Sequence, residues 1–212
     1  MPQPSPDAVA VATLGGAGGV LDDEAVRAFV HDRVGALDVA GRSVCVLVPD
    51  ATRSCPLPLL LGAVLDALEP RASRVTVVVA LGTHAPMAAE RLAAHVGFDQ
   101  RTPAATTTAL NHAWWDPATF ATVGTIDDAT VARLTDGRLR VGTAVRVNRA
   151  VVEHDRTLVV GPVLPHEVVG FSGGTKYLFP GVSGQEMIDL SHWVGALVTS
   201  PEIIGTPGPT PV

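Results

Sequence analysis

Side chains suited to proton transfer and anion binding recur where strands are expected to end. Asp50 and Arg53 lie in PDATRSCP, His84 lies in LGTHAP, and His166 lies in GPVLPHEVVG. Imidazole exchanges protons near neutral pH, and a guanidinium can hold a carboxylate through two parallel hydrogen bonds. Because ligands gather at the carboxyl ends of strands in open α/β sheets, these residues form a candidate site.

A glycine-rich loop, GFSGGTKYLFPGVSG at 170–184, contains the only lysine of the chain, Lys176. The chain has 15 lysine and arginine residues in total, so the other fourteen are arginine. Lys176 follows His166 by ten residues, and His192 follows the lysine by sixteen. The convergence of several strand ends, one glycine-rich loop and a single lysine favours a functional site over a set of unrelated loop residues.

Taken singly, each of these residues also has a purely structural interpretation. Asp50 can cap the turn that follows it and pair with Arg53, a histidine after a strand is more often an ordinary loop residue, and His192 fits the boundary of an amphipathic helix. Spacing indicates only structural roles for the remaining histidines, which are His31, His95, His112 and His154.

Two rival motifs fit the loop poorly. GFSGG matches the G-x-S-x-G nucleophile elbow with Ser172 as nucleophile, but the glycines and proline that follow spoil the expected helix, and only His192 lies downstream. A phosphate-binding P-loop requires G-x-x-x-x-G-K-[ST], which does not surround Lys176. The sequence therefore disfavours both a serine hydrolase and a P-loop protein.

Two valine-rich runs predict buried parallel strands. SVCVLVPD covers 43–50 and RVTVVVALGTH covers 74–84, and both end in turn residues followed by a helix pattern. In the second helix pattern, Pro86 suits the first turn and Gly97 suits the end. Alternating strands and helices indicate an α/β fold with a mainly parallel sheet flanked by helices.

The rest of the chain adds further expected elements. The last predicted helix carries Ser183 and Glu186 at the spacing of a capping box. The predicted elements are helices at 21–37, 56–69 and 184–199 and strands at 144–153 and 157–165.

Composition bounds the class of protein. The chain has 212 residues, 47% of them hydrophobic, and a mean hydropathy of +0.31, which predicts one domain with a core that needs no disulfides. A net charge of −6 argues against nucleic-acid binding. Cys45 and Cys55 form no disulfide framework, and we find no signal peptide or apolar run of ~18 residues, so we expect a cytoplasmic protein with no membrane span.

In combination, PDATRSCP, ALGTHAPM, HEVVGFSGGTKYLFPGVSG and His192 resemble the N-terminal domain of the nickel-pincer lactate racemase family. The resemblance extends from about residue 10 to the end of the chain. It implies a Rossmann-like α/β domain of a two-domain family whose members racemise or epimerise 2-hydroxy acids. Residues 1–200 are then expected to form the cofactor-binding domain, and the Pro/Gly-rich segment 201–212 a linker toward a C-terminal domain that is absent from this sequence.

The resemblance assigns roles to individual residues. By this resemblance, Lys176 is expected to carry a nickel-pincer nucleotide (pyridinium-3,5-bisthiocarboxylic acid mononucleotide nickel) covalently, and His192 to complete the nickel coordination. His84 and His166 correspond to the acid–base pair, and Arg53 to the substrate-orienting arginine. The remaining residues expected to contact the cofactor are Asp50, Thr52, Gly173, Gly174 and Pro180.

This chemistry explains the single lysine and the paired histidines. A primary amine can condense with an activated acyl group, whereas a guanidinium is a poor nucleophile at neutral pH. Abstracting the α-proton of a 2-hydroxy acid is hard beside a carboxylate, so the family instead moves a hydride to the cofactor and back. Each enantiomer then needs a base for its hydroxyl proton, which two histidines can provide.

The resemblance also implies partners and leaves alternatives. The expected partners are a small 2-hydroxy acid, the cofactor-synthesis enzymes, and the missing C-terminal domain or a partner chain that supplies further substrate contacts. One alternative is a non-catalytic cofactor-binding fragment or a subunit of a split enzyme. The other is a different isomerase or redox enzyme on the same cofactor scaffold.

Overall fold

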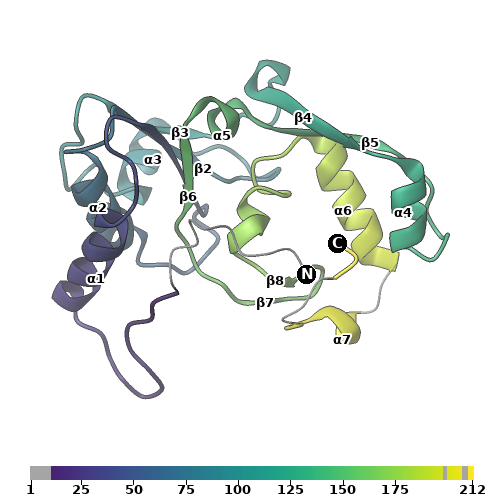
Figure 1. Ribbon diagram of the computed structural model, residues 1–212, viewed down its shortest axis with the longest axis horizontal. Helices are drawn as coiled ribbons and strands as arrows, with labels where there is room; N and C mark the ends of the chain where they lie inside the picture. The colour runs from purple at the N-terminus through teal and green to yellow at the C-terminus, as the bar shows by residue number, and fades with distance from the viewer. Residues whose placement is uncertain (1–10, 198–199, 207–209) are drawn as a thin grey trace.

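The computed structural model describes residues 11–197, 200–206 and 210–212. Its centre is a parallel four-stranded sheet with the strand order β3-β2-β1-β6 (Figure 1). The strands are β1 (Ser43–Val48), β2 (Arg74–Val79), β3 (Thr107–Asn111) and β6 (Arg156–Val159). The expected α/β architecture with a parallel sheet is therefore confirmed.

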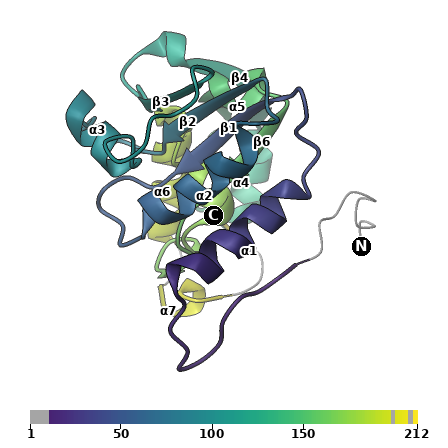
Figure 2. The same ribbon diagram turned by 90° about the vertical axis from the view of Figure 1, so that its left-hand side faces the viewer.

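Both faces of β1 are covered, which explains its unbroken apolar sequence. All five residues from Val44 to Val48 are 0% exposed. Alternate side chains of a strand point to opposite faces. Val44, Val46 and Val48 pack with α2 (Leu57–Leu68), and Cys45 and Leu47 belong to a second cluster on the other face. Figure 2 shows α2 and α1 (Asp23–Gly35) stacked together on the first face.

The helix after β2 is shorter than the sequence predicts. It runs from Ala89 to His95 as α3, so Pro86 lies outside it and its predicted place in the first turn is wrong. The reason is a contact with the end of β3: the side chain of Asn111 accepts from the amide of Met87 at 3.1 Å and donates to its carbonyl at 2.9 Å. This pairing holds the chain before α3 outside the helix. Gly97 follows the helix with a φ of +77°, as a terminating glycine should.

An antiparallel arm projects from the sheet and was not predicted. It consists of β4 (Phe120–Ile126), α4 (Asp128–Leu134) and β5 (Thr143–Asn148), with the two strands paired to each other. The run at 144–153, predicted as one strand, divides into β5 and the short helix α5 (Arg149–Glu153). Asn148 causes the division, because its side chain accepts from the amide of Ala150 and so caps the helix.

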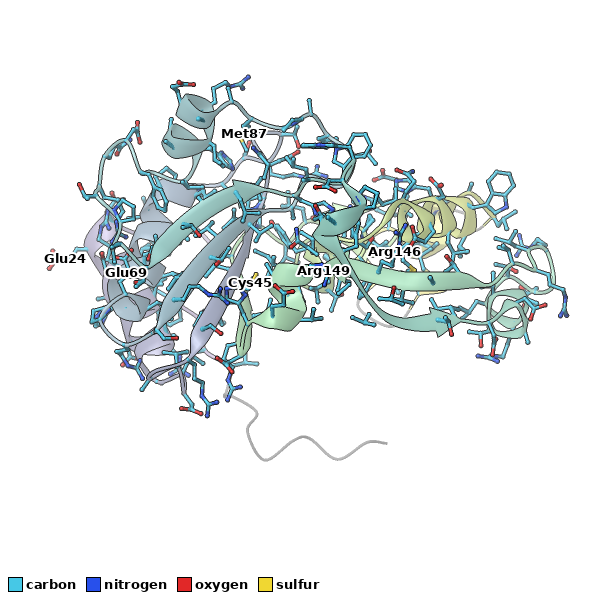
Figure 3. All side chains as sticks on the ribbon, turned by 90° about the horizontal axis from the view of Figure 1, so that it is seen from above. Glu24, Cys45, Glu69, Met87, Arg146 and Arg149 are labelled. Carbon is cyan, nitrogen blue, oxygen red and sulfur yellow. The ribbon has the colours of Figure 1, made fainter. Side chains whose placement is uncertain are left out.

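The last quarter of the chain crosses the carboxyl edge of the sheet. It contains β7 (Pro165–His166), β8 (Gly170–Phe171), the 3₁₀ turn η2 (Gly174–Tyr177), the short α7 (Ser200–Ile203), and α6 (Gln185–Leu197). Helix α6 packs on β5, and Figure 3 shows Arg146 of β5 beside it. Ile203 is buried, and the amide of Gly205 donates to the carbonyl of Gly170, so the segment predicted as a linker begins packed against β8.

The predicted capping box at the start of α6 does not form. The hydroxyl of Ser183 donates to the carbonyl of Pro180, and Glu186 forms a two-pronged ion pair with Arg146. Both predicted capping side chains therefore have other partners. The ion pair instead fixes the first turn of α6 to β5. Within the described part of the chain, no helix is long and apolar enough to cross a membrane.

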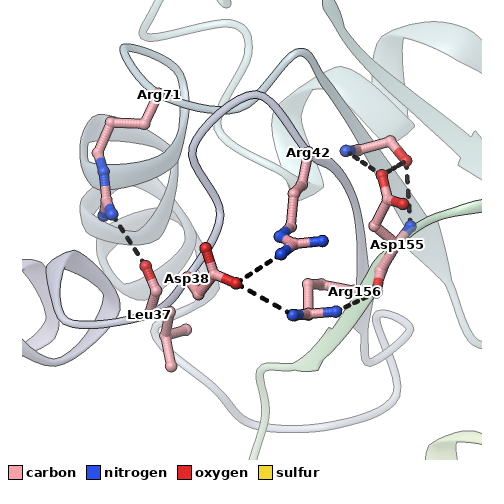
Figure 4. A network of polar contacts seen from close by, with 7 residues as sticks. Leu37, Asp38, Arg42, Arg71, Asp155 and Arg156 are labelled. Carbon is pink, nitrogen blue, oxygen red and sulfur yellow. Dashed lines mark hydrogen bonds and ion pairs between the residues drawn. The ribbon is translucent and has the colours of Figure 1, made fainter.

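A network of charged side chains lies at the amino end of the sheet (Figure 4). Asp38 accepts from Arg42 at 2.7 Å and from Arg156 at 3.3 Å. Asp155 accepts from the amide and the hydroxyl of Ser43, both at 2.8 Å. These contacts join the starts of β1 and β6, far along both strands from the residues with candidate chemistry.

Candidate functional site

A cleft of about 280 Å³ lies at the carboxyl edge of the sheet. Its walls come from the ends of β1 and β2, the β7–β8 segment, the glycine-rich loop and α6. Most of the predicted site residues line it together, namely Asp50, Arg53, His84, His166, Gly173, Lys176, Pro180 and His192. Segments far apart in sequence thus meet at one place.

Asp50 and His84 form a hydrogen-bonded pair at one side of the cleft. One carboxylate oxygen of Asp50 accepts from the hydroxyl of Thr52 at 2.6 Å and from its amide at 3.1 Å, and the other contacts Nδ1 of His84. Burial raises the pKa of Asp50, but the hydrogen bonds from His84 and Thr52 outweigh it and lower the pKa overall. Since a carboxylate only accepts, Nδ1 of neutral His84 carries the proton and Nε2 is left as a base.

The backbone around His84 is also fixed. The indole of Trp114 donates to the carbonyl of His84 at 3.0 Å. The amide of Gly82 donates to the carbonyl of Gly181 at 2.8 Å, which ties the loop after β2 to the loop that carries Lys176. The loop that carries His84 and the loop that carries Lys176 are therefore held at a fixed separation.

Glycines allow the lysine loop to fold tightly. Gly173 has a φ of +81°, and a Cβ there would lie 2.5 Å from the carbonyl oxygen of Pro162. A Cβ at Gly181 would lie 2.4 Å from the carbonyl oxygen of Tyr177. At Gly174, by contrast, φ is +51° and no atom lies within 4 Å of the Cβ position. The loop is thus packed on one side and open at Gly174, where the backbone can be approached closely.

The amino group of Lys176 is held in an environment that favours its neutral form. Burial lowers the pKa of Lys176, the positive charge of Arg53 lowers it further, and Glu167 opposes the shift. Neither Lys176 nor Arg53 makes a side-chain hydrogen bond or ion pair with any other described residue. A half-buried amine with a lowered pKa and no partner is available as a nucleophile.

His166 presents a different nitrogen from His84. Its Nδ1 accepts from the amide of Val168 at 3.0 Å, so the neutral ring carries its proton on Nε2. Burial lowers the pKa of His166, and the positive charge of Lys176 lowers it further. The two histidines of the cleft therefore differ in tautomer, with Nε2 an acceptor in His84 and a donor in His166.

His192 lies on α6, where its ring is oriented by its own helix. Its Nδ1 donates to the carbonyl of Ile188 at 2.7 Å, which leaves Nε2 free to bind a metal. Among the described residues, no group of three or more His, Cys, Asp or Glu side chains is placed to hold a metal ion. His192 could thus supply one ligand, and a group bound in the cleft would have to supply the others.

Not every predicted residue lines the cleft. Thr52 contributes by bonding Asp50, and Gly174 lies beside the cleft. Ser172 does line it, but its hydroxyl contacts the carbonyl and amide of Leu164, both at 3.2 Å, and a 3₁₀ turn follows, so no nucleophile elbow is formed. Sequence reasoning missed Glu167 and Tyr177, whose only signal was adjacency to His166 and Lys176.

Comparisons with known proteins identify the family of this chain. The family model of the lactate racemase N-terminal domain matches residues 24–203. The chain belongs to that family. It is 26% identical over 173 residues to a lactate racemase of Lactiplantibacillus plantarum, which covers 81% of this chain and 37% of that protein.

Further relatives show the same pattern of partial coverage. A lactate racemase of Thermoanaerobacterium thermosaccharolyticum is 23% identical over 71% of this chain and 32% of its own length. A crystal structure of a Thermotoga maritima protein is similar with a TM-score of 0.78 and 29% identity, over 89% of this chain and 45% of that one. The structure of the T. thermosaccharolyticum lactate racemase apoprotein gives a TM-score of 0.62 at 21% identity, over 78% and 38%. The chain therefore spans less than half the length of these proteins.

Proposed function

We propose that this chain is the cofactor-bearing catalytic half of a 2-hydroxyacid racemase or epimerase of the lactate racemase type. The observation that supports this most strongly is the shared cleft of His84, His166, Arg53, Lys176 and His192. Membership of the family supports the racemase assignment. The nickel-pincer cofactor and the transfer of hydride to and from it are part of the proposal.

The residues present fit a lysine-tethered nickel cofactor. The unpaired amine of Lys176 can attack an activated acyl carbon, forming an amide bond while the activating group leaves and the nitrogen loses a proton. Nε2 of His192 is free to coordinate nickel, and imidazole with sulfur ligands suits that metal. When bound, the cofactor supplies a carbon that takes up a hydride and returns it.

The chain's own residues would then manage the substrate. The guanidinium of Arg53, which has no partner among the described residues, binds the carboxylate. Nε2 of His84, oriented by Asp50, removes the hydroxyl proton of one enantiomer. We assign the other enantiomer to His166. To take up a proton at Nε2, its ring must first carry its own proton on Nδ1, which breaks the hydrogen bond from the Val168 amide. Because the chain spans only part of its relatives, the remaining substrate contacts and the exclusion of water would come from a second domain or a partner chain.

An assay with and without that second half tests the proposal. The chain would be co-expressed with cofactor-synthesis enzymes, mixed with the C-terminal half of a lactate racemase, and supplied with D- or L-lactate. We expect conversion toward the racemate from either enantiomer. A cofactor-loaded chain that converts no 2-hydroxy acid with the second half present would contradict the catalytic role and favour a cofactor-binding fragment. Net oxidation or reduction would favour another enzyme on the same scaffold.

A further inference from the structure

Tyr177 follows the proposed attachment lysine and is the only tyrosine of the chain. Its ring packs in the second core cluster with Cys45, Leu47 and Val182 and is only 8% exposed. A Cβ at Gly161 would lie 1.9 Å from the tyrosine hydroxyl oxygen, so a glycine after β6 makes the room that the hydroxyl occupies. The ring is thus fixed in one place across the carboxyl edge of the sheet.

The hydroxyl of Tyr177 has no hydrogen-bond partner among the described residues, although the residue lines the cleft. Among the described residues only Thr107 Oγ1 is a fully buried side-chain polar atom without a partner, so the Tyr177 hydroxyl is in contact with the solvent of the cleft and can be reached by a ligand there. The hydroxyl of Ser172 in the same cleft is by contrast bonded to Leu164. An unpaired hydroxyl in the cleft wall is free to donate a hydrogen bond to a ligand.

The surroundings of Tyr177 indicate an anionic ligand. Burial, followed by the nearby thiol of Cys55, raises the pKa of Tyr177 to about 12, so at neutral pH the hydroxyl is a hydrogen-bond donor. Arg53 lies close enough to act on it electrostatically and also lacks a partner. Asp50 lies nearby too, but its two oxygens are occupied by Thr52 and His84. A free donor beside a free cation makes a site for an acceptor with negative charge.

We propose that the Tyr177 hydroxyl is a carboxylate-binding group that holds the substrate carboxylate together with Arg53. The inference rests on the proposed function, because the 2-hydroxy acid is the carboxylate in question. Tyr177 would thereby orient the substrate so that its hydroxyl faces the imidazoles. A carboxylate can accept from both donors, because each of its two oxygens has lone pairs to share.

The single tyrosine makes a direct test possible. Protein labelled with ¹³C-tyrosine gives a ring signal from residue 177 alone, which would be followed by NMR during titration of the cofactor-free chain with lactate, propionate or inorganic phosphate. We expect lactate and propionate both to shift the signal saturably, since they share the carboxylate. A signal that neither carboxylate moves, or that moves with lactate and not propionate, overturns the carboxylate assignment. Saturation by phosphate alone also overturns it.

Substitution then measures the contribution of the hydroxyl. Tyr177→Phe should weaken lactate binding about tenfold in ligand-observed NMR, as for loss of a hydrogen bond to a charged group. Its thermal midpoint should not fall, because no hydrogen bond in the folded chain is lost. Ser172→Ala, which removes a paired hydroxyl from the same cleft, should leave the affinity unchanged. Equal binding by Tyr177→Phe and the parent chain would refute the inference. The proposed function is tested separately, by cofactor attachment to Lys176 and by racemisation with the second half present.

Discussion

The two ends of the parallel sheet differ in whether their basic side chains have partners. At the amino end, Asp38 holds Arg42 and Arg156, and Asp155 holds Ser43. At the carboxyl end, Arg53 and Lys176 have no side-chain partner among the described residues. Paired charges hold the fold together, whereas unpaired charges in a cleft remain available to a ligand. The difference supports the proposal that the functional site is at the carboxyl end, where open α/β sheets generally bind their ligands.

The largest effect is expected for the two histidines of the cleft. The variants would be tested in the cofactor-loaded chain mixed with the C-terminal half of a lactate racemase. There, His84→Ala or His166→Ala should lower the racemisation rate by ~10²–10⁴-fold, as for loss of general acid–base catalysis. The rates of D-to-L and L-to-D conversion should both fall, because one imidazole takes up a proton and the other gives one in each conversion. Chiral chromatography from each enantiomer measures this, with His31→Ala on α1 as a histidine control. A variant impaired in one direction alone would refute the pairing.

A partial effect is expected at the proposed metal ligand. His192→Ala should reduce the nickel retained after gel filtration, while the cofactor itself keeps part of the metal and stays on Lys176. Metal analysis alongside intact mass separates the two. Trp193→Ala is the matched control, since the neighbouring side chain on α6 is 62% exposed. Unchanged nickel in cofactor-loaded His192→Ala would remove this residue from the coordination shell.

A smaller effect is expected on the reactivity of the lysine. Lys176 should react with an amine-directed acylating reagent at a pH midpoint below the ordinary lysine range, because burial and then Arg53 lower its pKa. Arg53→Gln removes a positive charge that disfavours the protonated amine, so the midpoint should move up. Peptide mapping separates Lys176 from the N-terminal amine. A midpoint that stays or moves down would contradict the electrostatic link between the two residues.

The smallest effect is expected at the amino end. Asp38→Asn removes an exposed carboxylate from the network of Arg42 and Arg156, and exposed ion pairs contribute little to stability. The thermal midpoint should fall by a few degrees at most, and the reaction midpoint of Lys176 should not change. A shift in lysine reactivity from this end would show that the two ends are not independent.

Sequence reasoning succeeded where the signal is local. The valine runs of β1 and β2 are buried on both faces, so their apolar patterns were unambiguous. The chemistry at the strand ends followed from the rule that such ends converge. The roles of the individual site residues remain predictions that only experiment can test.

Sequence reasoning failed where contacts between residues far apart in the chain determine the structure. β4 is largely exposed and pairs with β5 across a helix, so no apolar pattern marked the arm. Ser183 and Glu186 had capping-box spacing, but partners at Pro180 and Arg146 prevailed. The role of Tyr177 was invisible because it depends on Gly161 at the end of β6, and no sequence motif joins the two.

Peptide mapping of the cofactor-loaded protein tests the central claim most directly. The chain and Lys176→Arg would each be co-expressed with cofactor-synthesis enzymes, digested and analysed by mass spectrometry. We predict a covalent adduct on the peptide that contains Lys176, and none on any peptide of the variant. An adduct that persists in Lys176→Arg, or one located on another residue of the parent chain, would contradict the assignment of this cleft as the cofactor site.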